Sequence, residues 1–157
     1  MKVTNASCLH PTTEIALPDF STKQLKDIRV GDKVLSLNPM TNEFEEDVVS
    51  ATDALMNKFG DDKDIWTFSD GSTITTIHPH EFYSVDDQKF KYIANFNIGE
   101  RLLKLVDGKL VEVKLEKHEN IVEKTPHATL FTQKNNIYFA NGILTGNRNS
   151  AKLHIRG

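Results

Sequence analysis

The sequence predicts an all-β fold, and three observations support this prediction. Short runs rich in β-branched and aromatic residues recur along the 157-residue chain, with turn residues between them at close intervals. Helical periodicity is weak, so the alternating helices of a βαβ fold are not expected. One stretch of the chain also repeats an earlier stretch, which indicates two related halves.

The strands are expected between turn dipeptides. Asp70-Gly71 separates two β-branched runs and is therefore expected at the tip of a hairpin. Asp107-Gly108 and Asn141-Gly142 are turn dipeptides of the same kind. The expected strands are residues 33–37, 65–68, 73–77, 101–105, 110–115, 128–132 and 137–140.

Helices are expected to be few and short. The best helical candidates are residues 47–58 and the one-turn segments 22–27 and 92–96. Residues 53–63, which overlap the first of these, and residues 118–120 are polar and are expected in solvent loops.

The internal repeat links residues 25–37 to residues 93–105 at a constant offset of 68, without a gap. Every apolar position of the first segment is apolar in the second, and Gly31 matches Gly99. A shared glycine followed by an acidic and then a basic residue predicts one backbone turn used twice, each time leading into a strand. We therefore expect two halves that pack into one body with pseudo-twofold symmetry. The alternative is a common turn–strand signature that arose twice independently.

Composition excludes several classes of protein. The chain has 19 basic and 22 acidic residues and a net charge of -3, which argues against broad nucleic-acid binding. No apolar run reaches the about 20 residues needed to span a membrane, and Met1–Ser7 is too short and polar for a secretory signal. We expect a monomer without nucleic-acid or membrane partners.

The single cysteine, Cys8, excludes an internal disulfide framework and a multi-cysteine zinc site. A lone thiol is typical of a reducing compartment, which favours the cytoplasm. His78 and His80 would supply half of a metal site, but Cys8 or His10 would have to reach them through the fold. No metal and no cofactor are therefore expected.

Three residues stand at positions that suggest chemistry. Cys8 opens the first structured segment, His80 follows the expected strand 73–77, and Asn147 ends the run after Asn141-Gly142. Alone, each has an ordinary explanation, because single cysteines are often inert and buried and histidines often pack in cores. The order of these three residues along the chain is what makes them candidates for catalysis.

In this order the sequence resembles the Hint superfamily, which comprises inteins, bacterial intein-like domains and hedgehog autoprocessing domains. An initial cysteine at Cys8 and residues 28–34 resemble the first splicing region of inteins. Residues 71–83 resemble the block with the catalytic histidine, usually Thr-x-x-His, and the following Phe-Tyr pair assigns that role to His80. Residues 139–147 resemble the closing block that normally ends in His-Asn.

The resemblance implies a horseshoe-like Hint fold over residues 8–147, with residues 1–7 and 148–157 as flanks. It also implies autocatalytic processing of the chain itself, as in an intein without an endonuclease. The Cys8 thiol would convert the Ser7–Cys8 amide to a thioester with His80 as proton donor. Thr76 or His78 would orient His80.

At the other end of the domain, Asn147 would cyclise and release Arg148. The nucleophiles are built into the chain, so its own flanks are the substrate.

Several positions depart from the family pattern. Ile77 stands where threonine is usual, Gly146 replaces the penultimate histidine, and Asn136 lies where many members have a further histidine. Thr129 lies near a position that is often acidic, and Arg148 follows the terminal asparagine where standard inteins have Cys, Ser or Thr. The last departure is more similar to bacterial intein-like domains. A Hint-like scaffold that has lost activity and serves as a linker or binding module is therefore the alternative.

Overall fold

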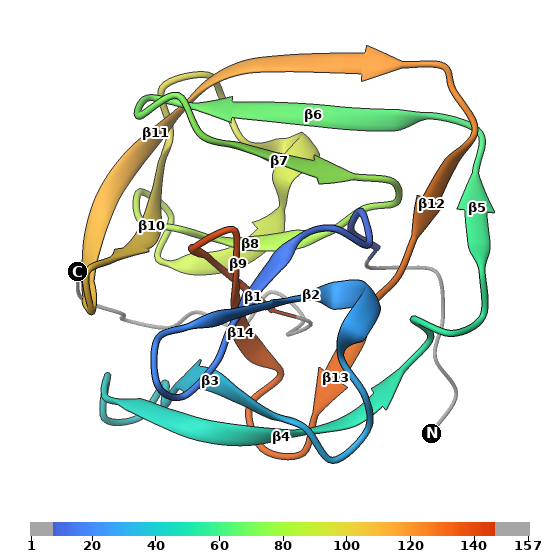
Figure 1. Cartoon of the computed structure of the whole chain (residues 1–157). Coiled ribbons are helices and arrows are strands. Elements are labelled where there is room, and N and C mark those ends of the chain that lie inside the picture. Colours follow the sequence, from blue (N-terminus) through green and yellow to red (C-terminus); the bar gives the residue numbers. More distant parts are fainter. Residues whose placement is uncertain (1–7, 147–157) are drawn as a thin grey trace.

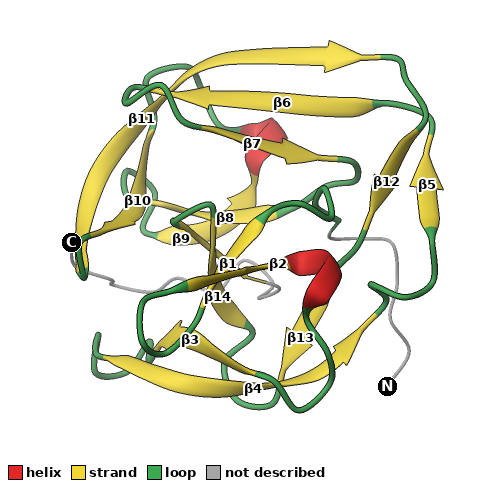
Figure 2. Ribbon diagram, viewed as in Figure 1, coloured by secondary structure: helices red, strands yellow, loops and turns green. Residues whose placement is uncertain are grey.

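The computed structural model describes residues 8–146, and these form an almost entirely β structure (Figures 1 and 2). Helix in this part of the chain is confined to two single 3-10 turns, η1 (Leu25–Asp27) and η2 (Ile93–Asn95). The all-β prediction is confirmed. The strands are β1 (Glu14–Ala16), β2 (Thr22–Gln24), β3 (Lys33–Leu37), β4 (Phe44–Thr52), β5 (Lys58–Gly60), β6 (Lys63–Phe68), β7 (Thr73–Thr76), β8 (Glu81–Ser84), β9 (Lys89–Tyr92), β10 (Arg101–Val106), β11 (Lys109–Ile121), β12 (Thr125–His127), β13 (Leu130–Thr132), β14 (Ile137–Ala140) and β15 (Ile143–Gly146).

The strands form one large antiparallel sheet and two small ones. The large sheet runs in the order β2-β1-β14-β15-β10-β11-β6-β7, and β8 joins it by pairing with β15 and β9. The small sheets are β13-β4-β3 and β12-β5. Strand β4 and the pair β6–β11 lie at opposite edges of the molecule, and β5 and β12 connect them along one side, which gives the expected horseshoe-like outline (Figure 1). Among the described residues, no helix is long and apolar enough to cross a membrane.

The two halves use the same local structure, as the internal repeat predicts. Gly31 and Gly99 have φ values of 92° and 93°, a left-handed conformation that glycine adopts without a steric cost. The Gly31 amide donates to the Val49 carbonyl at 2.9 Å, and the Gly99 amide donates to the Leu115 carbonyl at 2.7 Å. The same turn therefore attaches β3 to β4 in one half and β10 to β11 in the other.

The acidic residues after the two glycines also act alike. Asp32 accepts a hydrogen bond from the backbone amide three residues earlier, and so does Glu100. Lys23 pairs with Asp32 at 3.0 Å, and Lys91 pairs with Glu100 at 2.6 Å. The two lysines are again 68 positions apart in the sequence. This agreement of turn, acid and partner confirms the predicted pseudo-twofold relation.

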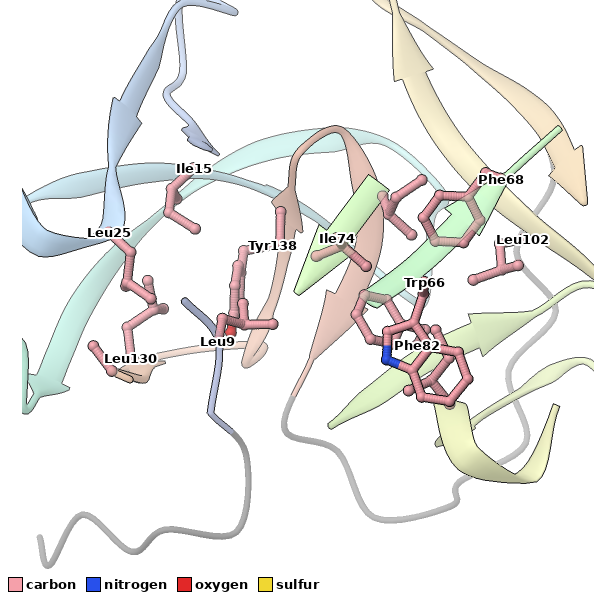
Figure 3. Packing of buried hydrophobic residues seen from close by; sticks show 14 of the residues in the cluster. Leu9, Ile15, Leu25, Trp66, Phe68, Ile74, Phe82, Leu102, Leu130 and Tyr138 are labelled. Atoms are coloured by element: carbon pink, nitrogen blue, oxygen red, sulfur yellow. The ribbon is translucent and has the colours of Figure 1, made fainter. Parts of the chain in front are cut away.

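The core lies between the sheets and reaches the start of the described chain. Its larger cluster contains Leu9, Trp66, Phe82, Leu130 and Tyr138, all less than 5% exposed (Figure 3). Burial of such side chains supplies about 1.5–3 kcal/mol each before entropy losses. Because Leu9 belongs to this cluster, the core itself fixes the position of Cys8.

The predicted helix over residues 47–58 is wrong, because residues 44–52 form β4 and residues 58–60 form β5. Asp47, Val49 and Ala51 are buried at alternating positions, which is the two-residue period of a strand. The sequence hides this period because a carboxylate occupies one of the inward positions. Asp47 is buried with its charge satisfied by the Thr132 hydroxyl at 2.7 Å and the Asn135 amide at 2.8 Å.

The Asp70 carboxylate ties the β6–β7 hairpin to β10 and provides a test of the fold by pH. Although partial burial opposes it, hydrogen bonds from Lys104 and Ser72 lower the pKa of Asp70 to about 2. Since this pKa is below the unfolded value, the carboxylate stabilises the fold above pH 3.8 and loses this effect as the pH falls through 2.

We expect Asp70→Asn to cost about 1 kcal/mol at pH 7, a value reduced for the solvent screening of a partly exposed pair. By pH 3 this difference should shrink by about half. Urea unfolding of both proteins at the two pH values measures it, and a pH-independent difference would contradict the role of the charge.

Candidate active site

Cys8 and Leu9, the first described residues, form an extended segment between the segments that contain Thr76 and Ala128. Leu9 bridges Ala128 on one side and Thr76 on the other. The amide and carbonyl of Leu9 each hydrogen-bond to Ala128 at 2.9 Å, and the Cys8 carbonyl accepts from the Ile77 amide at 3.1 Å. Cys8 is therefore fixed by backbone pairing at the end of β7 and beside the start of β13.

Two imidazoles border the Cys8 thiol. The Sγ atom of Cys8 and one ring nitrogen each of His78 and His127 all lie within 4.8 Å of one another. The two rings meet edge to face with centroids 4.9 Å apart. Cys8 and His127 are buried, and His78 is half-buried. The nucleophile predicted from the sequence thus has two nitrogen bases within reach.

The environment of His127 favours the neutral form of its ring. Burial lowers the pKa of His127, and the neighbouring His78 lowers it further. A neutral imidazole can accept a proton, so His127 is suited to assist the ionisation of a nearby thiol.

Tyr138 and His80 form the next layer of the site. Burial raises the pKa of Tyr138, and the proximity of Cys8 raises it further. Its hydroxyl therefore stays protonated at neutral pH and can donate a hydrogen bond. The His80 ring is completely buried, with its centroid 6.4 Å from that of Tyr138 and 5.2 Å from that of Phe82.

The C-terminal arm of the described chain reaches the same segment. Gly146, the last residue of β15, pairs with Glu81 at the start of β8, and the Thr145 hydroxyl donates to the Glu81 carbonyl. The segment from Ile77 to Glu81 therefore contacts both ends of the described chain. Ile77 binds the Cys8 carbonyl, and Glu81 pairs with β15. Backbone pairing thus brings Cys8 and Gly146 to the two ends of one five-residue segment.

Glycine at position 146 has a steric explanation. A Cβ atom added there would lie 2.5 Å from the carbonyl oxygen of Asn136, closer than such atoms approach in real structures. We expect Gly146→Ala to destabilise the fold by about 1–3 kcal/mol, since the backbone has to move. Urea unfolding measures the cost, and an unchanged unfolding midpoint would contradict the close approach.

The predicted supporting residues have structural partners. The Thr76 hydroxyl accepts a hydrogen bond from the Trp66 indole at 2.9 Å. The Thr129 amide donates at 2.8 Å to the carboxylate of Asp53, which is buried and pairs with Lys58 at 3.4 Å. An acidic group is therefore present next to Thr129, although it comes from the residue that follows β4.

Asn136 has a role in a turn. Its side-chain oxygen accepts from the Thr132 amide, and its own amide donates to the Thr132 hydroxyl. Ser7, Asn147 and Arg148 lie outside the described residues.

Sequence reasoning missed three features of the site. No sequence signal marks His127, Tyr138 or Asp53, because long-range strand pairing alone brings them near Cys8 or Thr129. The proximity of His78 did have a signal, since Thr75 stands three residues before it and gives Thr-x-x-His without a departure. The signal for His80 is the Phe-Tyr pair that follows it.

The comparison with solved structures agrees with this architecture. A bacterial intein-like domain from Clostridium thermocellum is 22% identical, with a TM-score of 0.77, over 90% of this chain and 99% of that chain. A DnaB intein from Synechocystis sp. PCC 6803 is 15% identical, with a TM-score of 0.74, over 90% of this chain and 98% of that chain. The gp41-1 intein is 22% identical, with a TM-score of 0.70, over 89% of this chain and 98% of that chain.

A scan of protein-family models found no match, and a search of curated proteins found none either. The structural likeness shows the fold: residues 8–146 adopt the fold of inteins and bacterial intein-like domains, as the resemblance implies.

Proposed function

We propose that the domain from Cys8 to Asn147 processes its own chain by cleaving, and in part rejoining, the peptide bonds at its two borders. The observation that carries this proposal is the segment from Ile77 to Glu81, which contacts Cys8 on one side and Gly146 on the other. Asn147 follows Gly146 in the sequence, and Cys8 and Gly146 are the described residues next to the two borders. Proximity of this kind is what an intramolecular reaction requires.

The first step is an N-to-S acyl shift. The Cys8 sulfur attacks the Ser7 carbonyl carbon, the C–N bond breaks, and the released amine of Cys8 takes up a proton. His127 supports the step as acceptor of the thiol proton, because its ring favours the neutral form and lies near the sulfur.

The proton donor is an imidazole of the segment from His78 to His80. His78 has stronger support than His80, because a nitrogen of His78 lies within 4.8 Å of the sulfur and the Thr75-x-x-His78 spacing fits the family pattern. His80 remains the second candidate, since its buried ring packs against Tyr138 and Tyr138 borders Cys8.

The second step is cyclisation of Asn147. Its side-chain nitrogen attacks its own backbone carbonyl, the bond to Arg148 breaks, and a C-terminal succinimide forms with release of the Arg148 amine. The structure offers no room for a histidine Cβ at Gly146, so another group has to polarise this carbonyl. A slow second step follows from this difference.

Arg148 has no nucleophilic side chain, so a branched intermediate cannot form at that position. The thioester then reacts with water, with an added thiol, or with the Arg148 amine released by Asn147. The last reaction joins the flanks, and it requires cyclisation to occur first. We expect cleavage at both borders to compete with ligation.

An inactive scaffold is the second candidate function. Gly146 favours it, because inteins usually place a histidine there, and so does Arg148. Such a module would use the same fold to link or bind other segments without breaking a peptide bond.

Incubation of the purified chain with and without dithiothreitol distinguishes the two functions. An active domain releases the peptide Met1–Ser7 faster with the thiol, because the thiol intercepts the thioester. Intact-mass spectrometry over time measures this release. A chain that stays whole under both conditions would support the scaffold and contradict self-processing.

A further inference from the structure

We propose that a polar recess beside β7 binds a small oxyanion of the phosphate type. The recess has a volume of about 250 Å³ and lies between the segment that follows Leu9 and the strands β6 and β7. Its lining includes His10, Thr12, Lys63, Thr73, Thr75 and Asn141. Within the part of the chain that the structure describes, every lining residue is polar or basic and none is acidic. This site takes no part in the proposed reaction, so the inference does not depend on the proposed function.

Lys63 supplies the positive charge of the recess. Its ammonium group lies close enough to His10 that its charge, after burial, lowers the pKa of that imidazole. An anion held between the two side chains would be attracted by Lys63 and would offset this repulsion. Lys63 pairs with Glu123 at 3.2 Å, but the Glu123 side chain is 60% exposed, so water screens the pair and an anion can compete for the ammonium group.

His10 can donate a hydrogen bond to an anion even when its ring is neutral. The Nδ1 atom of His10 accepts from the backbone amide of Thr12 at 3.2 Å, and it lies 2.9 Å from the Thr12 hydroxyl. Because a backbone amide can only donate, Nδ1 carries no proton, and the proton of the neutral ring is on Nε2. The neutral ring therefore keeps one N–H donor beside Lys63.

Strand β7 adds further donors, while its carbonyl groups are already engaged. Thr73 and Thr75 are alternate residues of this strand and are not buried, so both face outward on the same side. The Thr75 carbonyl accepts from the His10 amide at 3.1 Å. The Thr73 carbonyl accepts from the Asn141 side-chain amide at 3.0 Å. These two oxygens would repel an anion if they were free, whereas the two threonine hydroxyls can donate to it.

The recess therefore combines one full positive charge with several uncharged donors, and a phosphate oxygen accepts from both kinds of group. Asn141 fixes one wall, because its side-chain oxygen also accepts from the Glu14 amide at 2.8 Å. A bound anion would tie His10 to β6 and β7. We therefore expect phosphate to raise the unfolding midpoint of the chain, since the folded state alone has the site.

A nuclear magnetic resonance titration of the full chain with sodium phosphate at pH 7 tests the binding. Sodium chloride keeps the ionic strength constant throughout. We expect saturable shifts of the backbone amides of His10, Thr12 and Thr75. Lys63→Met should weaken the affinity at least about 10-fold, because it removes a charge-assisted hydrogen bond. Thr75→Val should weaken it by about 3-fold, because it removes a neutral donor of similar shape.

Lys33→Met is the matched control. Lys33 lies on β3, well away from β7, and pairs with Glu46 at 3.4 Å (Figure 1). This variant loses the same charge as Lys63→Met and should bind phosphate with the parent affinity. Unfolding curves in chloride show whether each variant is folded, and Thr75→Val suffices if Lys63→Met is not.

Three results would overturn the inference: shifts that grow without saturation, equal affinity in the parent and in both recess variants, or an equal loss of affinity in Lys33→Met and Lys63→Met. The last result would assign the binding to net charge alone. A chain that binds phosphate in the recess but never self-cleaves refutes only the proposed function. A chain that self-cleaves but does not bind phosphate refutes only this inference.

Discussion

Cys8→Ala should abolish release of Met1–Ser7 and leave cleavage after Asn147 intact. The variant lacks the only sulfur nucleophile of the chain, so no thioester can form at that border. Asn147→Ala should do the reverse, because alanine has no side-chain amide to cyclise. In the double variant the chain should stay whole. Intact-mass spectrometry of the fragments after prolonged incubation measures both cleavages separately.

The fold of the Cys8 variant needs its own control. Cys8 is completely buried, although alanine is smaller by one atom and the backbone bonds of the segment do not involve the side chain. An unfolding midpoint close to that of the parent shows that the loss is chemical. Equal release of Met1–Ser7 in the parent and in Cys8→Ala would refute the assignment of the nucleophile.

The sequence was sufficient where local chemistry determines the backbone. Gly31 and Gly99 both adopt a positive φ, and the residues after them lead into equivalent strands, so aligning the two segments predicts the pseudo-twofold relation. The hairpin tip at Asp70-Gly71 follows from turn preference alone, and β6 pairs with β7 across it. In such places the residue type alone indicates the backbone conformation.

The sequence was misleading where tertiary partners determine which face of a segment is buried. Asp47 faces inward because Thr132 and Asn135 donate to it, and these partners are more than 80 positions away. Residues 118–120 were expected in a loop, yet they belong to the 13-residue strand β11. His118 there is stacked on Trp66 of β6, so its partner also comes from elsewhere in the sequence.

The residues of the candidate site also differ in whether local sequence or tertiary pairing determines their position. Cys8, which the family pattern predicts as the nucleophile, is completely buried. His127 comes near it only because Leu9 pairs with Ala128, and no local pattern encodes that pairing. The Thr75-x-x-His78 spacing is the sequence signal that favours His78 over His80. In the structure a nitrogen of His78 lies within 4.8 Å of the Cys8 sulfur.

His78→Gln should slow release of Met1–Ser7 by about 10²–10⁴-fold, the usual effect of removing a general acid or base. Glutamine keeps a polar side chain of similar size but cannot carry a proton to the leaving amine at neutral pH. His80→Gln should slow the reaction less, since its ring contacts Phe82 and Tyr138 and acts on Cys8 through them. Rates are measured by quantifying the released peptide after addition of dithiothreitol.

The matched control is His118→Gln, which should process at the parent rate because His118 lies on β11 with Asp64 and Trp66 as its partners. The opposite ranking, with His80→Gln inactive and His78→Gln near the parent rate, would return the donor role to His80. In that case His78 would lie near the Cys8 sulfur without supplying the proton. The ranking of these two variants therefore decides which imidazole supplies the proton.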